Sequence, residues 1–226
     1  MSDTLESTVG DLVVERPSRS RVFSKLGIDF CCGGKKTLRQ ACREHALEPS
    51  AVLSLLEEET SPEPRSTWAD APLSLLVTHI VDKHHVFTRS EVERLRGMLD
   101  KVARVHGANH PYMIEVAAIF RRFGDEMVAH MAKEERALFP AIVSLESHSP
   151  ALDLGMPIRV MTAEHESAGA DLEKMRRLTS DYTPPEGACN TFRAALAGLA
   201  DLEADLHEHV HLESNVLFPR ALKLAR

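Results

Sequence analysis

Four segments of this chain carry apolar residues at spacings of three and four, with almost no strand-type alternation. Such spacing places apolar side chains on one face of an α-helix. The segments are, in chain order, about residues 73–102, 116–138, 158–175 and 192–217. Pro111 and Pro157 suit the first turns of the second and third helices. Four amphipathic helices with fairly short connections predict an all-α, up-down-up-down four-helix bundle.

In each of the four segments, histidine or glutamate interrupts the apolar stripe, which is the apolar face of the expected helix. These interruptions fall at about the same height of the expected bundle. Burying an imidazole or a carboxylate without a partner costs several kcal/mol, so these groups must be satisfied together. A metal site explains the pattern, because both groups are ligands for iron, manganese and zinc. His84 lies on a shorter apolar stripe and is the alternative to His85. The candidate metal ligands are His85, His130, Glu134, His165, His209 and Glu213.

A repeated motif strengthens the metal hypothesis. The runs from His130 to Pro140 and from His209 to Pro219 share His, Glu, Leu, Phe and Pro at identical offsets. Residues four apart lie on one helical face, so each copy offers an imidazole and a carboxylate to the same side. A competing di-iron pattern uses Glu-x-x-His on two helices. The instance at residues 208–211 has no partner copy and is discounted.

The number of candidate ligands favours two ions over one. Zinc typically takes four ligands. Six ligands with Glu134 and Glu213 as bridges give about eight of the roughly 12 bonds that two octahedral ions need. A shared oxo or hydroxo group would leave about one open position per ion. Open positions indicate chemistry or small-molecule binding rather than a closed structural site.

The composition is that of an ordinary globular protein. Of the 226 residues 43% are hydrophobic, and the formal net charge is −7. These values argue against global disorder and against non-specific nucleic-acid binding. No apolar run approaches the ~18 residues of a membrane span, and the first ten residues lack a secretory pattern. Four cysteines make no disulfide scaffold, so we expect a cytoplasmic protein.

A proline-containing segment without apolar periodicity divides the chain. We interpret residues 60–70 as a linker. It separates a small helical N-terminal domain, residues 1–59, from the bundle domain, residues 71–226. Trp68 is expected to anchor the linker to one of the two units.

Adjacent cysteines distinguish the N-terminal unit. Cys31 and Cys32 precede two glycines, which predicts a tight loop that exposes backbone and thiols. Lys35 and Lys36 are expected to favour thiolate over thiol, and Thr37 is expected to cap the next helix. Metal or redox chemistry is the functional interpretation of the cysteines. Two structural cysteines in a turn are the alternative.

Other polar residues carry weaker signals. Glu126 and Glu164 flank ligand positions and fit either a supporting role beside the ligands or a solvated face. Cys189 is interpreted as a small core residue. Six histidines are interpreted as surface or loop residues: His79, His106, His110, His148, His207 and His211.

These two units together resemble the family of iron–sulfur cluster repair di-iron proteins, the RIC family of YtfE/ScdA type. The resemblance covers nearly the whole chain. It rests on Asp29-Phe-Cys-Cys-Gly-Gly34, His130-Met-Ala-Lys-Glu134-Glu with Leu-Phe-Pro, Ala163-Glu-His165, and His209-x-x-x-Glu213 with Asn215-Val-Leu-Phe-Pro-Arg220.

The resemblance implies a hemerythrin-like bundle with a non-haem di-iron centre on the six candidate ligands, and it favours His85 over His84. It implies cytoplasmic repair of clusters damaged by nitric oxide or peroxide, with Cys31 and Cys32 matching the family's cysteines. Oxygen-carrying hemerythrins have one more histidine, at the position of Gly169 here. We therefore expect a more accessible and more labile iron.

The leading hypothesis is a stress protein that restores damaged iron–sulfur clusters by donating iron. Cys31 and Cys32 would contact the cluster, accept nitrosyl groups or pass iron on. The enzymatic alternative is reduction of nitric oxide to nitrous oxide at the two irons. A third hypothesis is binding of oxygen or nitric oxide without chemistry. Expected partners are damaged iron–sulfur proteins and these small ligands, without nucleic acid or membrane; a homodimer is left open.

Overall fold

The computed structural model describes residues 2–59, 67–147 and 153–225. Within these ranges every regular element is helical, which confirms the predicted all-α class. None of the helices in the described ranges is both long and apolar enough to cross a bilayer. Linker residues 60–66 and His148 lie outside the described residues.

Five short helices form the N-terminal unit. They are α1 (Ser2–Glu6), α2 (Val9–Glu15), α3 (Arg19–Lys25), α4 (Leu38–Glu44) and α5 (Pro49–Glu58). Thr37 caps α4 as predicted: its hydroxyl accepts from Gln40 N at 3.2 Å, and the Gln40 side chain accepts from Thr37 N at 3.0 Å. Fully buried Phe23 and Leu38 centre a core of the unit's own.

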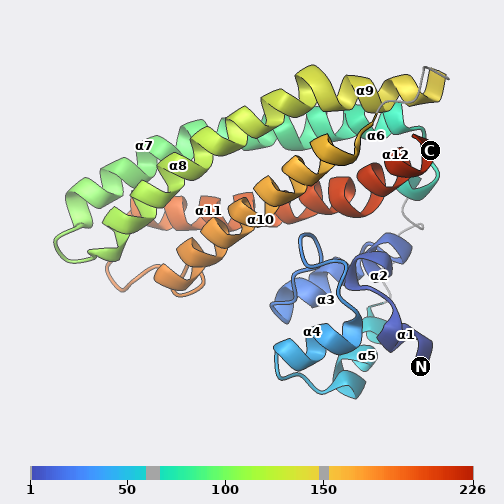
Figure 1. Cartoon of the computed structure of the whole chain (residues 1–226). Helices are drawn as coiled ribbons and strands as arrows, with labels where there is room; N and C mark the ends of the chain where they lie inside the picture. The colour runs from blue at the N-terminus through green and yellow to red at the C-terminus, as the bar shows by residue number, and fades with distance from the viewer. Residues whose placement is uncertain (1, 60–66, 148–152, 226) are drawn as a thin grey trace.

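Four long rods form the bundle (Figure 1). The first joins α6 (Leu73–His79), η2 (Ile80–His85) and α7 (Val86–His106). The second joins α8 (Tyr112–Lys133), η3 (Glu134–Leu138) and α9 (Phe139–Ser144). The third is α10 (Gly155–Leu178), and the fourth joins α11 (Asn190–His211), η5 (Leu212–Leu217) and α12 (Phe218–Leu224). The predicted four-helix bundle is confirmed.

Three rods contain a π-helical turn where candidate ligands lie. The turns are η2, η3 and η5. Pro140 and Pro219 directly follow η3 and η5, at the starts of α9 and α12. Proline has no N–H to bond to the carbonyl four residues earlier, which favours a local change of helical winding. The repeated Leu-Phe-Pro therefore has a structural reason, whereas η2 forms without a proline.

Two apolar cores fill the bundle on either side of one polar level. One core includes Phe120 and Leu199, and the other includes Phe139 and Leu217, all at most 2% exposed. The candidate ligands fall between these cores. Packed apolar residues above and below hold the rods in register, so the polar side chains meet at a fixed height.

The N-terminal unit packs against the fourth rod (Figure 1). Val210 of α11 belongs to the apolar core of the N-terminal unit. The Phe30 ring contacts His207 and His211, with ring centroids 5.9 and 5.8 Å away. Near the end of the expected linker, the Trp68 ring stacks on that of His79 of α6, with ring centroids 4.4 Å apart, so Trp68 anchors this end of the segment to the bundle.

Candidate metal centre

All six predicted ligands are buried at the polar level between the two cores. Each side chain is at most 2% exposed. They come from all four rods: His85 from the first, His130 and Glu134 from the second, His165 from the third, and His209 and Glu213 from the fourth. The structure therefore brings together the whole set that the sequence singled out.

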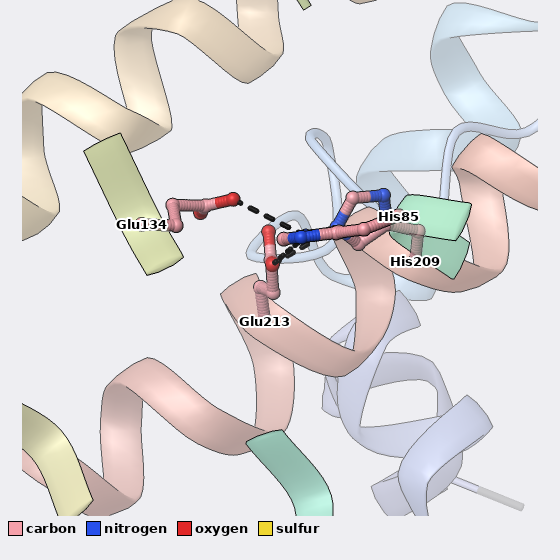
Figure 2. Close-up of side chains that lie close together, drawn as sticks. All are labelled: His85, Glu134, His209 and Glu213. Atoms are coloured by element: carbon pink, nitrogen blue, oxygen red, sulfur yellow. Dashed lines mark hydrogen bonds and ion pairs between the residues drawn. The ribbon is translucent and has the colours of Figure 1, made fainter. Parts of the chain in front are cut away.

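The side chains form two groups that share both carboxylates. His85, Glu134, His209 and Glu213 each offer one ligand atom, and these atoms lie within 4.8 Å of one another (Figure 2). His130 and His165 complete a second such group with the same two glutamates. Each group thus supplies two imidazoles and two carboxylates.

Each glutamate lies between two histidines of different groups. Glu134 Oε1 is 3.3 Å from His130 Nε2, and Oε2 is 3.5 Å from His85 Nε2. Glu213 Oε1 is 3.0 Å from His209 Nε2, and Oε2 is 3.0 Å from His165 Nε2. One oxygen of each carboxylate thus faces each group, which suits carboxylates shared by two cations.

The polar atoms in the site are poorly satisfied by one another. Both Glu134 oxygens are buried without a hydrogen-bond partner. The Nε2 atoms of His85 and His209 face each other at 3.2 Å, as do those of His130 and His165 at 3.1 Å. Buried oxygens without donors and converging ring nitrogens are what cations would satisfy. The residues present therefore fit a pair of metal ions.

The site attracts positive charge. Burial lowers the pKa of His85, but the negative charges of Glu134 and Glu213, 3.5 and 3.9 Å from His85 Nε2, outweigh it and raise the pKa to about 10. The pKa of His130 rises to about 9 against the same burial effect, chiefly through Glu134. Protons and metal ions are therefore competing occupants of one pocket.

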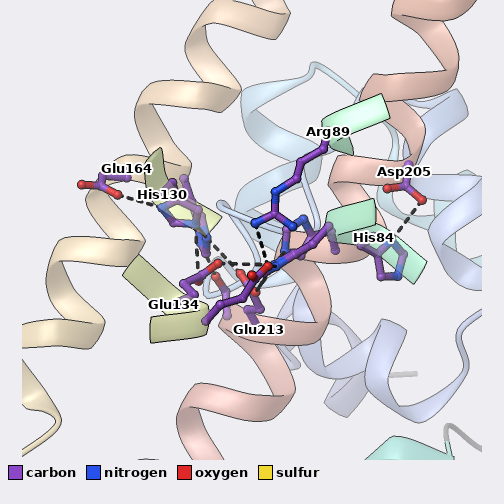
Figure 3. A network of polar contacts seen from close by, with 12 residues as sticks. His84, Arg89, His130, Glu134, Glu164, Asp205 and Glu213 are labelled. Atoms are coloured by element: carbon purple, nitrogen blue, oxygen red, sulfur yellow. Dashed lines mark hydrogen bonds and ion pairs between the residues drawn. The ribbon is translucent and has the colours of Figure 1, made fainter. Parts of the chain in front are cut away.

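Outer contacts orient three of the four imidazoles, and Figure 3 shows the contact between Glu164 and His130. Glu135 Oε1 lies 2.7 Å from His85 Nδ1 and is itself held by Arg89 at 2.8 Å. Glu164 Oε2 lies 2.7 Å from His130 Nδ1. Such carboxylate–histidine contacts fix the ring and its tautomer in metal sites.

The other two imidazoles differ in their outer contacts. His165 Nδ1 meets the Ser214 hydroxyl at 3.2 Å. His209 Nδ1 is buried without a hydrogen-bond partner, and the parallel ring of His84 lies 5.6 Å away. Of the two glutamates expected to flank the ligands, Glu164 takes a supporting role. Glu126 instead lies 3.8 Å from Arg122 on the outer face of α8.

His84 points away from the two groups. It is fully buried, and its Nδ1 lies 3.0 Å from Asp205 Oδ1 (Figure 3). Its other neighbouring acid, Glu208, binds Lys83 through both oxygens at 3.0 Å. The geometry thus places His85, and not His84, among the converging side chains.

Asp29 organises the cysteine loop. Its Oδ1 accepts from the backbone N of Cys31 and Cys32 at 2.9 and 3.0 Å, and its Oδ2 accepts from Gly33 N at 2.8 Å. The Cys32 thiol reaches the bundle, where its Sγ lies 3.6 Å from the carbonyl oxygen of His165. The two cysteines and His165 line one cavity of about 640 Å³ between the N-terminal unit and the bundle.

The expected thiolate is not supported at Cys31. A hydrogen bond that the Cys31 thiol donates to Cys32 Sγ, burial and the negative charge of Asp29 raise the pKa of Cys31 well above its ordinary value. Lys36 Nζ lies 2.5 Å from Glu44 Oε2, in an ion pair with that carboxylate, and does not stabilise a thiolate. Sequence proximity to lysine was misleading here, because the lysine side chain turns to another partner.

Two further expectations are wrong. His211 was expected at the surface but is only 6% exposed, because the N-terminal unit covers this face of α11. Its Nδ1 lies 3.0 Å from Asn215 Nδ2. Cys189 is exposed at the start of α11, beside His106 Nε2 at 3.2 Å. The structural roles of Asp29 and Asn215 were also missed, although both residues stood in the quoted motifs.

Comparison with known proteins matches both units of the chain. Residues 76–221 match the family described as "Hemerythrin HHE cation binding domain". Residues 5–60 match the family ScdA_N, described as "Domain of Unknown function (DUF542)". The first family confirms the hemerythrin-like character of the bundle and its association with bound cations.

Similar full-length proteins carry one name, "Iron-sulfur cluster repair protein YtfE". The protein from Yersinia pseudotuberculosis is 38% identical over 222 residues, covering 98% of this chain and 99% of that protein. The protein from Dickeya chrysanthemi is 38% identical over 219 residues, covering 96% and 97%. This chain therefore belongs to the family of hemerythrin-like iron–sulfur cluster repair proteins.

Proposed function

We propose that this protein binds two iron ions in the bundle and repairs iron–sulfur clusters damaged by nitrosative or oxidative stress, by donating iron. The observation that carries the proposal is the pair of buried groups that share Glu134 and Glu213. The family resemblance and the names of the similar proteins support iron and cluster repair.

The proposed ligands are His85, His130, Glu134, His165, His209 and Glu213, with both carboxylates shared between the ions. Bound iron would supply the ions that a damaged cluster has lost. The chain's own residues keep that iron in place: Glu135 and Glu164 orient two of the ligands, and apolar cores above and below limit water.

We assign Cys31 and Cys32 to contact with the damaged cluster. Their loop lines the cavity that also reaches His165, so a cluster held by these thiols would lie close to the metal centre. The raised pKa of Cys31 means that this thiol must lose its proton on binding a metal. We also propose the domain division 1–59, linker 60–70 and 71–226, which the two matched ranges support.

The test uses a purified [4Fe–4S] protein inactivated with nitric oxide. Iron-loaded protein should restore its cluster spectrum and activity, and metal-free protein should not. Replacing both cysteines by alanine should leave two irons per chain while repair falls. Repair by the metal-free protein, or no repair by the loaded one, would contradict the proposal. Unchanged repair by the double cysteine variant would remove the N-terminal unit from the mechanism.

A second candidate function is reduction of nitric oxide to nitrous oxide. A cavity of about 310 Å³ between α8 and α10 supports it, because Phe123, Met127 and the ligand candidate His130 line it, with charged Lys133 and Glu164 also in its wall. A small neutral gas could occupy such a cavity beside the metal centre. Two nitric oxide molecules, two electrons from an external reductant and two protons would give nitrous oxide and water. Sustained nitrous oxide formation over many turnovers distinguishes this reaction from repair alone.

A further inference from the structure

One side chain of the fourth rod bonds directly to the backbone of the cysteine loop. Asn215 Nδ2 donates to the carbonyl oxygen of Phe30 at 3.1 Å and lies 3.4 Å from that of Cys31. The same nitrogen lies 3.0 Å from His211 Nδ1. The carboxamide of Asn215 thus connects the N-terminal unit to the helix that carries Glu213.

Two glycines make room for this carboxamide. A Cβ atom placed on Gly10 or on Gly34 would lie 2.7 Å from Asn215 Oδ1, closer than such atoms approach in real structures. Gly10 N also donates to Gly34 O at 2.8 Å, so the backbones of the two glycines lie side by side against Asn215. Asn215 is therefore enclosed by backbone that could not carry side chains at these positions.

Asn215 also stands next to the metal centre in the chain. It follows Glu213 by two residues in the π-helical turn η5. Between them, Ser214 bonds His165 Nδ1 through its hydroxyl at 3.2 Å. One helical turn therefore contacts the cysteine loop on one side and the candidate ligands on the other.

The loop held in this way presents a thiol to α10. Cys32 Sγ lies 3.6 Å from His165 O and 3.7 Å from where a Cβ on Gly169 would lie. A large side chain at position 169 would compete with the thiol for this space. The absence of a side chain at Gly169 lets Cys32 reach the backbone of a ligand-bearing helix.

We propose that Asn215 is a positioning residue that fixes the place of the Cys31–Cys32 loop relative to η5 and α10. It thereby holds the Cys32 thiol beside the backbone of His165, at the edge of the metal centre. The consequence for repair rests on the proposed function, whereas the positioning itself does not. Loss of the carboxamide should free the loop while the buried ligands stay in place.

The test compares Asn215→Ala and Asn215→Asp in the full-length, iron-loaded protein. Asn215→Asp keeps the shape but replaces the donor to Phe30 O with a second acceptor, so the contact becomes repulsive. The matched control is Asn109→Ala, which makes the same chemical change at an exposed turn at the far end of the bundle. Three quantities are measured: iron per chain, alkylation of Cys32 by iodoacetamide, and hydrogen exchange of the amides at 29–34.

Both Asn215 variants should alkylate at Cys32 several-fold faster and exchange the loop amides faster. Their iron content and the exchange of α7 and α8 should match the parent and the Asn109→Ala control. Unchanged alkylation and exchange in both variants would overturn the proposal. Loss of iron in both would also overturn it, because Asn215 would then act on the metal centre itself.

Gly10→Ala tests the same contact from the other side. Its added methyl should displace the Asn215 carboxamide and reproduce the faster alkylation, whereas Gly97→Ala, with open space around it, should not. The double variant Gly10→Ala/Asn215→Ala should alkylate no faster than Asn215→Ala alone, since both changes break one contact. Additive effects would contradict the proposal; if Gly10→Ala fails to fold, Asn215→Asp decides.

Should iron-loaded parent protein fail in cluster repair while the alkylation results hold, the proposed function fails and the positioning role stands. Should repair succeed in the parent and fall in both Asn215 variants at full iron content, positioning is part of the repair mechanism. Normal repair despite a released loop would restrict the role of Asn215 to domain docking and remove it from repair.

Discussion

Replacing Glu134 by leucine should destabilise the metal-free protein. The Glu134 side chain is 0% exposed, and its oxygens lie 3.3 Å from His130 Nε2 and 3.5 Å from His85 Nε2. Without metal these imidazoles are the cations that face Glu134, because their pKa values are raised to about 9 and about 10. Removing one partner of a buried ion pair costs about 3–5 kcal/mol, since the other charge is left buried and unpaired.

The size of the effect follows from that cost. For a chain of this length, 1 kcal/mol shifts the melting temperature by about 2–4 °C. A loss of about 3–5 kcal/mol therefore predicts a fall of about 6–20 °C in the metal-free state. Iron should stabilise the parent and not the variant, by about 2.7 kcal/mol when free metal is at ~100 times its dissociation constant.

Differential scanning calorimetry of metal-free and iron-loaded samples measures both quantities. Glu93→Leu, an exposed change on α7, is the matched control and should stay within about 0.5 kcal/mol of the parent. A metal-free Glu134→Leu protein that melts at or above the parent would refute the reasoning. The carboxylate would then be an unsatisfied buried group retained only for metal binding.

Three other changes test neighbouring parts of the account. Glu164→Gln should weaken metal affinity about 10–100-fold in competition with a chromogenic chelator, whereas Glu126→Gln should not; equal affinities would contradict the orienting role. His85→Asn should lower the iron content, while His84→Asn should keep it; the reverse result would exchange their assignments. Because the pKa of Cys31 is raised above its ordinary value of 9.0, its alkylation rate should reach half of its maximum only above that pH; a midpoint at or below pH 9.0 would contradict the shift.

Helical periodicity predicted most of the bundle, because one apolar face per rod determines which residues meet inside. Pro111 stands directly before α8 as expected, and Pro157 lies in the first turn of α10, which begins two residues earlier at Gly155. The same periodicity placed His130 and Glu134 on one inner face. Periodicity could not foresee η2, since its sequence carries no proline to disturb the winding.

Contacts between the two units lay beyond sequence reasoning. Periodicity describes a helix face but not what covers it, so buried His211 was taken for a surface residue. The meeting of Asn215 with Phe30 joins residues 185 positions apart, and that of Cys32 with His165 joins residues 133 apart. Only the packing of the N-terminal unit on the fourth rod creates these contacts.

Anomalous diffraction at the iron edge, on crystals of freshly purified protein, tests the central claim most directly. The account predicts two iron peaks per chain between Glu134 and Glu213, one beside His85 and His209 and the other beside His130 and His165. A site with no peak, in which those imidazoles and carboxylates hydrogen-bond only to one another, would contradict it.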